Sequence, residues 1–127
     1  MKLLLDTHIL LWAKAEPSRL SDVCVALLTD PENDLAFSVV SLWEVVIKSG
    51  HQQNFHADAG VLRRRLMDDG YDELAIVGEH AVAVASLPPI HKDPFDRLLV
   101  AQAMVERLTL LTADPLVARY PGQIRLV

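Results

Sequence analysis

The sequence has only one cysteine, Cys24, so an internal disulfide is excluded and a reducing compartment such as the cytoplasm is expected. Cys24 lies among valine and alanine residues, a setting more typical of helix packing than of a nucleophile. The chain also lacks an apolar run long enough to cross a bilayer. The apolar start at Leu3–Leu5 is interrupted by Asp6 and His8 too early for a signal peptide. We therefore expect a soluble, cytoplasmic protein without membrane contact.

An excess of basic residues is also absent. The formal net charge is −5, which counts against a basic surface for nucleic acid. If the acids gather in a metal site, however, bound cations neutralise them, and the negative net charge no longer excludes nucleic acid as a partner. The chain has no glycine-rich phosphate loop, no G-x-S-x-G segment and no metal-ligand spacing among its five histidines. His8, close to Asp6 in sequence, is interpreted as a partly packed helix residue.

What the sequence does contain is the composition of one folded domain. Hydrophobic residues make up 51% of the 127 positions, and we expect a single domain over residues 1–127. Short apolar runs alternate with segments of helical periodicity, which predicts an α/β fold with a central, mainly parallel sheet of four to five strands flanked by helices. The expected strands cover residues 2–5, 35–37, 73–77, 109–112 and 124–127. The expected helices cover residues 7–15, 21–28, 38 or 41 to 50, 57–69, 79–86 and 94–107, with a polar loop at 51–56 and a helical turn at 115–118.

Acidic residues stand at several of the expected strand–helix junctions. Asp6 directly follows the first strand, and Asp114 follows the fourth by two residues. Glu44 lies in the helix after the second strand, and Asp93 and Asp96 flank the start of the helix at 94–107. In open parallel sheets, ligands bind outside the carboxyl ends of the strands. The acids are therefore placed where a ligand site is expected.

Helix capping is the competing interpretation of each acid taken singly. Asp93-Pro94 and Asp114-Pro115 fit an N-cap followed by proline, and Asp6 could cap the helix that starts at residue 7. Ser41 with Glu44 fits a capping box. Capping does not require acids at four junctions, however, because Ser, Thr or Asn serve equally well. We retain the N-cap interpretation for Asp93.

Several carboxylates in one place repel one another unless a cation or protons offset their charge. Oxygen ligands without suitable histidine or cysteine spacing favour Mg²⁺ or Mn²⁺ over zinc. The acids taken together therefore predict a magnesium or manganese site.

Four segments, in this order along the chain, resemble the PIN-domain ribonucleases, and most of all the VapC-type toxins of bacterial toxin–antitoxin pairs. The resemblance covers nearly the whole chain, and it is the ordered set that is specific. The segments are LLLDTH (residues 3–8), SLWE (residues 41–44), HKDPFDRLLVAQA (residues 91–103) and LTAD (residues 111–114).

The resemblance implies that Asp6, Glu44 and Asp96 form the acidic core of a metal site, with Asp114 as the more variable fourth acid. These four would be both the metal ligands and the catalytic residues. The implied reaction is hydrolysis of RNA phosphodiester bonds, assisted by Mg²⁺ or Mn²⁺. Candidate supporting residues are Thr7, Thr112 and Asp93.

The resemblance also implies an RNA substrate, a homodimer and a cognate antitoxin protein that covers the site. Candidate RNA phosphate contacts are Lys48, Lys92 and Arg97. The run Arg63–Arg65 is a further candidate, although a solvated helix face is the better interpretation. Trp12 and Trp43 are interpreted as residues of the core or of a subunit contact rather than as base-stacking residues.

Three other functions are weighed against this one. A phospho-acceptor receiver domain needs an aspartate at the end of its central strand, but the expected third strand leads into Gly78-Glu79. A haloacid-dehalogenase-like phosphatase needs a second aspartate two residues after Asp6, where the chain has His8. The stronger alternative is a catalytically silent binding module of the same fold that acts through a protein partner. The complete set of acids counts against it.

Overall fold

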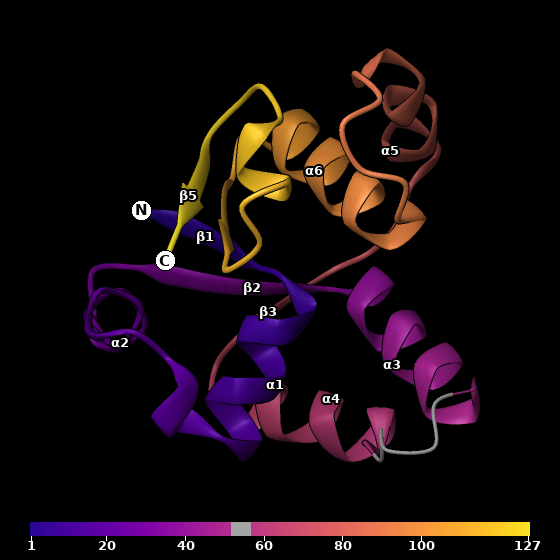
Figure 1. Cartoon of the computed structure of the whole chain (residues 1–127). Coiled ribbons are helices and arrows are strands. Elements are labelled where there is room, and N and C mark those ends of the chain that lie inside the picture. The colour runs from indigo at the N-terminus through magenta and orange to yellow at the C-terminus, as the bar shows by residue number, and fades with distance from the viewer. Residues whose placement is uncertain (52–56) are drawn as a thin grey trace.

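The computed structural model describes residues 1–51 and 57–127. At its centre is a five-stranded, all-parallel sheet with the strand order β3-β2-β1-β4-β5 (Figure 1). The predicted α/β fold is therefore confirmed. The strands are β1 (Lys2–Leu5), β2 (Asp34–Ser38), β3 (Asp72–Leu74), β4 (Thr109–Thr112) and β5 (Ile124–Leu126).

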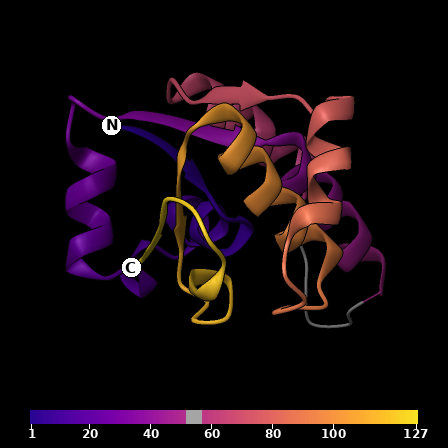
Figure 2. The ribbon, with the colours of Figure 1, turned by 90° about the horizontal axis from the view of Figure 1, so that it is seen from above.

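Helices cover both faces of the sheet. Figure 1 shows α5 and α6 on one side and α1 and α4 on the other, and from above α2 and α5 lie at opposite ends of the molecule (Figure 2). No helix within the described ranges is both long and apolar enough to span a membrane. The α-helices of these ranges are α1 (Thr7–Ala15), α2 (Asp22–Thr29), α3 (Val39–His51), α4 (Ala59–Asp68), α5 (Gly78–Ala83) and α6 (Pro94–Glu106), and the 3₁₀ helices are η1 (Pro17–Arg19), η2 (Val84–Ser86) and η3 (Val117–Arg119).

The two layers follow from the alternation of side chains along the strands. Leu3 and Leu5 of β1 belong to a core cluster shared with α1, α2 and α4, whereas Leu4 between them belongs to a second cluster shared with α6. In β4, Leu110 and Leu111 divide between the same two clusters. Successive strand residues point to opposite faces, so an uninterrupted leucine run suits a strand buried on both sides.

The parallel register brings the carboxyl ends of the central strands to one edge. Leu5 pairs with Leu111, and the backbone N–H of Asp6 donates to the Leu111 carbonyl at 3.0 Å. The neighbouring pair Leu4 and Ala36 aligns β2 with β1. The segments that leave β1, β2 and β4 therefore start side by side, and the acids that follow these strands lie at a common edge.

Some element boundaries differ from those expected. The third strand was expected at 73–77 but is Asp72–Leu74, because the chain leaves the sheet there and Ile76 and Val77 are exposed. The expected helix 57–69 starts at Ala59, where the Asp58 side chain accepts a hydrogen bond from the Val61 N–H. The helix at 79–86 divides into α5 and η2, and α3 runs one residue past Gly50. Residues 52–56 of the expected loop at 51–56 lie outside the described residues.

Substitutions at two glycines can test the backbone conformation of this fold. Gly70 follows α4 with φ of +85°, where a β-carbon is strained, whereas Gly50 lies in α3 with open space around a β-carbon. We expect Gly70→Ala to lower the free energy of unfolding by about 1 kcal/mol. Gly50→Ala should leave it unchanged or raise it by up to about 1 kcal/mol. Urea unfolding of the two variants measures the difference, and equal effects at both positions would contradict the assigned backbone conformations.

Candidate metal centre

Asp6 occupies the junction between β1 and α1 and uses both of its carboxylate oxygens. Oδ1 accepts a hydrogen bond from the Ile9 N–H at 3.0 Å, which makes Asp6 the N-cap of α1. Oδ2 accepts from the Thr112 hydroxyl at 2.6 Å, and the Thr112 oxygen in turn accepts from the Asp114 N–H at 3.0 Å. Only 4% of Asp6 is exposed. Burial raises the pKa of this carboxyl and outweighs the hydrogen bonds that lower it.

Glu44 is buried on α3 beside the start of α1. Its Oε1 accepts a hydrogen bond from the Thr7 hydroxyl at 2.5 Å, and the Thr7 oxygen also lies 2.9 Å from the Ser41 hydroxyl oxygen. Its Oε2 forms an ion pair with Lys48, one turn later. The capping-box interpretation of Ser41 with Glu44 is wrong, because α3 already begins at Val39. Ser41 and Thr7 instead form a hydroxyl pair beside the buried carboxylate.

The paired acids at the start of α6 have separate roles. Asp93 is the N-cap, as predicted: its Oδ1 accepts from the N–H groups of Phe95 at 2.8 Å and Asp96 at 3.3 Å. Asp96 lies in the first turn of the helix. Burial, followed by the charges of Asp93, Glu44 and Asp6, raises the pKa of Asp96 to about 7. These charges show that acids distant in sequence share one electrostatic environment.

His91 joins this group, although the sequence pattern did not identify it. Its Nε2 lies 3.3 Å from Asp96 Oδ2 and 3.2 Å from Asp114 Oδ2. Its Nδ1 accepts a hydrogen bond from the Asp93 N–H at 3.2 Å, which places the proton of the neutral ring on Nε2, facing the carboxylates. The Tyr120 hydroxyl accepts from the His91 N–H at 2.8 Å. The histidine spacing lacks a metal motif. The available signals were the place of His91 at the start of the segment HKDPFDRLLVAQA and its position two residues before a helix cap.

These contacts gather four predicted acids into one group, which we call the acidic cluster. It consists of Asp6, Glu44, Asp96 and Asp114. The donor set fits a divalent cation, because it offers carboxylate oxygens, the ligands that Mg²⁺ and Mn²⁺ prefer. Burial, and after it the charges of neighbouring acids, raise the pKa of Asp96, and a bound cation would offset both effects. Nε2 of His91 and carboxylate oxygens of Asp96 and Asp114 also lie within 4.8 Å of one another.

The three residues expected to contact RNA occupy different settings. Lys92 is exposed beside His91. Lys48 faces the acids: burial lowers its pKa, but the hydrogen bond and charge of Glu44 outweigh this effect and raise it. Arg97 has a structural role, since its guanidinium lies 3.1 Å from the Tyr120 hydroxyl oxygen and donates hydrogen bonds to three backbone carbonyls. Those carbonyls belong to Val84, Leu87 and Pro88.

The arginine run on α4 lies apart from these residues. Arg63 forms an ion pair with Glu73 of β3, and Arg64 and Arg65 are exposed. The interpretation of this run as a solvated helix face therefore fits the structure better than a phosphate contact.

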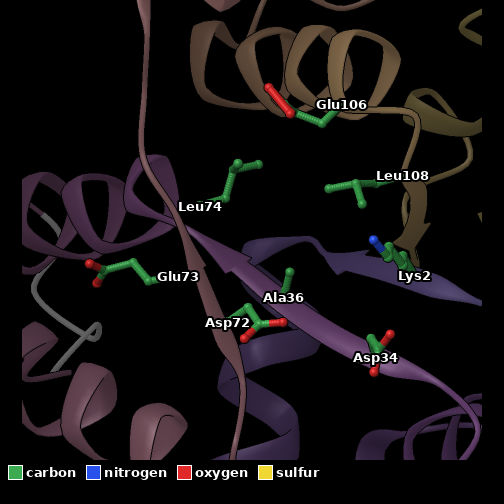
Figure 3. Close-up of a pocket in the computed structure, with 8 residues that line it drawn as sticks. All are labelled: Lys2, Asp34, Ala36, Asp72, Glu73, Leu74, Glu106 and Leu108. Carbon is green, nitrogen blue, oxygen red and sulfur yellow. The ribbon is translucent and has the colours of Figure 1, made fainter.

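A separate pocket of about 250 Å³ opens at the opposite edge of the sheet, near the amino ends of the strands (Figure 3). Carboxylates line it as well, but they accompany Lys2 and the apolar side chains of Ala36, Leu74 and Leu108. Its acids are Asp34, Asp72, Glu73 and Glu106. Because these acids lie far from the acidic cluster, a substitution of one of them can serve as a control for substitutions in the cluster.

Comparison with known proteins gives one family and a set of similar folds. The PIN domain model matches residues 3–123. No functionally curated protein matches. Among solved structures, the chain is similar to a chain of VapBC2 from Rickettsia felis, crystallised with a DNA fragment from its promoter, at 15% identity and a TM-score of 0.71, covering 100% of this chain and 99% of that one.

Two further structures have the same fold. A toxin–antitoxin complex from Klebsiella pneumoniae is 22% identical with a TM-score of 0.64, over 97% of this chain and 95% of that one. VapBC-5 from Mycobacterium tuberculosis is 16% identical with a TM-score of 0.62, over 99% of this chain and 97% of that one.

The raised pKa of Asp96 predicts a pH-dependent stability of the metal-free protein. Because this pKa is about 7 when folded and near 3.8 when unfolded, the folded state holds an additional proton between these values. Stability should therefore fall as the pH rises from about 4 to 7 and stay low above it. Asp96→Asn should remove the part of this fall that comes from Asp96 and leave the part that comes from Asp6, whose pKa is also raised. It should be more stable than wild type by up to about 4 kcal/mol at alkaline pH.

Urea unfolding in EDTA at several pH values measures this dependence. Asp72→Asn, which changes an exposed acid at the opposite edge, is the matched control and should retain the wild-type slope. An unchanged slope in Asp96→Asn would show that another group titrates.

Proposed function

The chain belongs to the PIN-domain family, and we propose that it is a divalent-metal-dependent endoribonuclease that acts as the toxin of a toxin–antitoxin pair. The observation that carries the proposal is the acidic cluster. In it, carboxylates from the β1–α1 and β4–η3 junctions, from α3 and from the first turn of α6 share one edge of the sheet. Capping accounts for Asp6 and Asp93, but it does not account for the burial of Glu44 or for the position of Asp96. RNA is the substrate that the motif resemblance supports.

The carboxylates would hold the cation, which we propose to be Mg²⁺ or Mn²⁺, and the hydroxyl groups would fix their orientation. Thr112 holds Asp6, and Thr7 holds Glu44. Because both threonines donate to carboxylate oxygens, they also reduce the cost of burying charge before a cation binds. When bound, a divalent cation supplies positive charge that stabilises the phosphate and acidifies a nearby water.

Asp114 is the most accessible acid of the cluster. Its side chain is 37% exposed, compared with 17% for Asp96, and Asp6 and Glu44 are almost fully buried. A water that attacks the phosphate from solvent would therefore meet Asp114 first. We assign Asp114 the role of accepting the proton of this water, and His91 the role of holding its carboxylate through Nε2–H.

The partner assignments rest on the solved structures of similar fold, which include VapBC assemblies and a toxin–antitoxin complex. We propose a cognate antitoxin that covers the acidic cluster, and a homodimer of the chain itself. Trp43, Val46 and Ile47 on α3 expose apolar surface that is available to such contacts. We propose that the protein acts in the cytoplasm, where RNA is accessible.

Cleavage of RNA by the antitoxin-free protein tests the activity. Wild-type protein should cut RNA in Mg²⁺ or Mn²⁺ and lose this activity in EDTA. Asp6→Asn and Asp96→Asn should each lower the rate by at least about 100-fold, because each removes a carboxylate that holds the cation. Circular dichroism establishes that the variants are folded.

Asp72→Asn serves again as the remote-acid control and should cut at the wild-type rate. Cutting that survives in folded Asp6→Asn protein would contradict the assigned site or reveal a contaminating nuclease. Metal binding without cutting of any RNA would favour the catalytically silent binding module.

Light scattering coupled to size exclusion tests the homodimer. We expect a mass of twice the 14.1 kDa of one chain. Val46→Glu places a charge on the exposed apolar face of α3 and should yield monomers if this face forms the contact. Arg64→Glu, on the exposed face of α4, is the matched surface control. A monomeric wild-type protein would contradict the proposed dimer.

A further inference from the structure

An open depression of about 260 Å³ lies beside the acidic cluster, and we call it the α1 depression. Two of its lining residues are also members of the cluster, so the two features share a wall. A ligand with one end at the carboxylates can therefore reach the depression directly. The lining residues are Asp6, His8, Trp12, Arg19, Ala113 and Asp114.

Three planar side chains form the wall of the α1 depression, and one of them is an arginine. His8 and Trp12 are four residues apart on α1 and therefore share a face, with ring centroids 5.9 Å apart. Arg19 of η1 folds back over the indole, with its guanidinium carbon 4.7 Å from the ring centre. The expectation that His8 is partly packed is wrong, since His8 is exposed. Trp12 packs against the core with one part, as expected, and lines the depression with another. That second part leaves its indole open to the base stacking that the sequence did not predict.

The arginine can rearrange without disturbing the fold. Its ion pair with Glu16 is long, at 3.6 Å, and both side chains are more than half exposed. Exposed pairs of this kind contribute little to stability. An incoming planar group can therefore stack on either the indole or the guanidinium at small cost.

We propose that the α1 depression binds one unpaired RNA base adjacent to the scissile phosphate, by stacking against Trp12 and Arg19. The inference rests on the proposed nuclease function and adds a specificity-determining subsite to it. Single-stranded RNA is recognised through bases stacked on aromatic rings and guanidinium planes. The volume falls below the roughly 300 to 1,000 Å³ of pockets that enclose drug-sized ligands, so it suits one ring system.

The shared wall favours RNA over a protein segment as the occupant. A nucleotide joins a phosphate to a base within one residue, so a phosphate held at the acidic cluster delivers its base to the neighbouring depression. Arg19 lies where its positive charge offsets the cluster acids, which otherwise repel the RNA backbone. An antitoxin side chain in the depression is the competing occupant, and the experiment below separates the two.

The chain offers a matched pair of fluorescent reporters, because it has two tryptophans on different helices. In Trp43→Phe protein, Trp12 is the only tryptophan, and in Trp12→Phe protein Trp43 is the only one. Titration with single-stranded oligouridylate and oligoadenylate in EDTA should quench the emission of Trp12 and leave that of Trp43 unchanged. Quenching of Trp43 alone, or of neither tryptophan while RNA binds by anisotropy, overturns the proposal.

Cleavage supplies the second measurement. A pool of single-stranded RNA with randomised positions is cut in Mn²⁺, and the cleavage sites are sequenced. Trp12→Leu and Arg19→Gln should each lower cutting of the preferred sequences roughly tenfold and flatten the base preference at one position next to the cut. Trp12→Phe should keep most of the preference, because it retains an aromatic face. Arg64→Gln, on the exposed face of α4, is the matched control for Arg19→Gln and should match wild type.

The outcomes distinguish this inference from the proposed function. Cutting with an unchanged base preference in folded Trp12→Leu and Arg19→Gln proteins overturns the subsite and leaves the nuclease intact. Absence of both cutting and RNA binding in wild-type protein overturns the nuclease and the subsite together. Quenching of Trp12 by the purified antitoxin but not by RNA assigns the depression to the protein partner and overturns the inference.

Discussion

Electrostatic repulsion among buried carboxylates is the constraint on which the rest of this structure depends. Parallel pairing of β1, β2 and β4 delivers acids to one edge of the sheet, where burial and then the charges of neighbouring acids raise the pKa of Asp96. The surrounding residues offset part of this cost, with hydroxyl donors at Asp6 and Glu44, an ammonium group at Glu44 and an imidazole donor between Asp96 and Asp114. What remains is a site that a divalent cation would complete.

The fold was largely predictable because its signals are local. An uninterrupted leucine run at Leu3–Leu5 requires burial on both faces, and the structure divides these leucines between two cores. Proline after Asp93 and glycine at position 70 mark the start and the end of helices. Among the boundaries that differ from the prediction, the end of β3 is set by where an edge strand loses its single partner. Local sequence does not encode that point.

The acids of the site were predictable, but their environment was not. For Asp6, Glu44 and Asp114, the position after a strand reveals the shared edge, since that is a property of parallel sheets. Asp96 follows a 3₁₀ helix and a loop, and the resemblance to the family assigned it to the site. The role of His91 depends on the Asp93 N–H, which orients the ring, and the role of Arg97 depends on carbonyls up to thirteen residues away. Ser41 was interpreted as a cap and proved to contact Thr7 across 34 residues. Such roles follow from tertiary contacts that spacing along the chain does not reveal.

The central claim is that the acidic cluster holds a divalent cation, and diffraction from crystals soaked in Mn²⁺ tests it most directly. We predict an anomalous peak at the acidic cluster, beside carboxylate oxygens of Asp6 and Asp96, and its loss in Asp96→Asn crystals. A peak only at the opposite pocket, beside Asp34 and Asp72, or no peak in either place, would contradict the account.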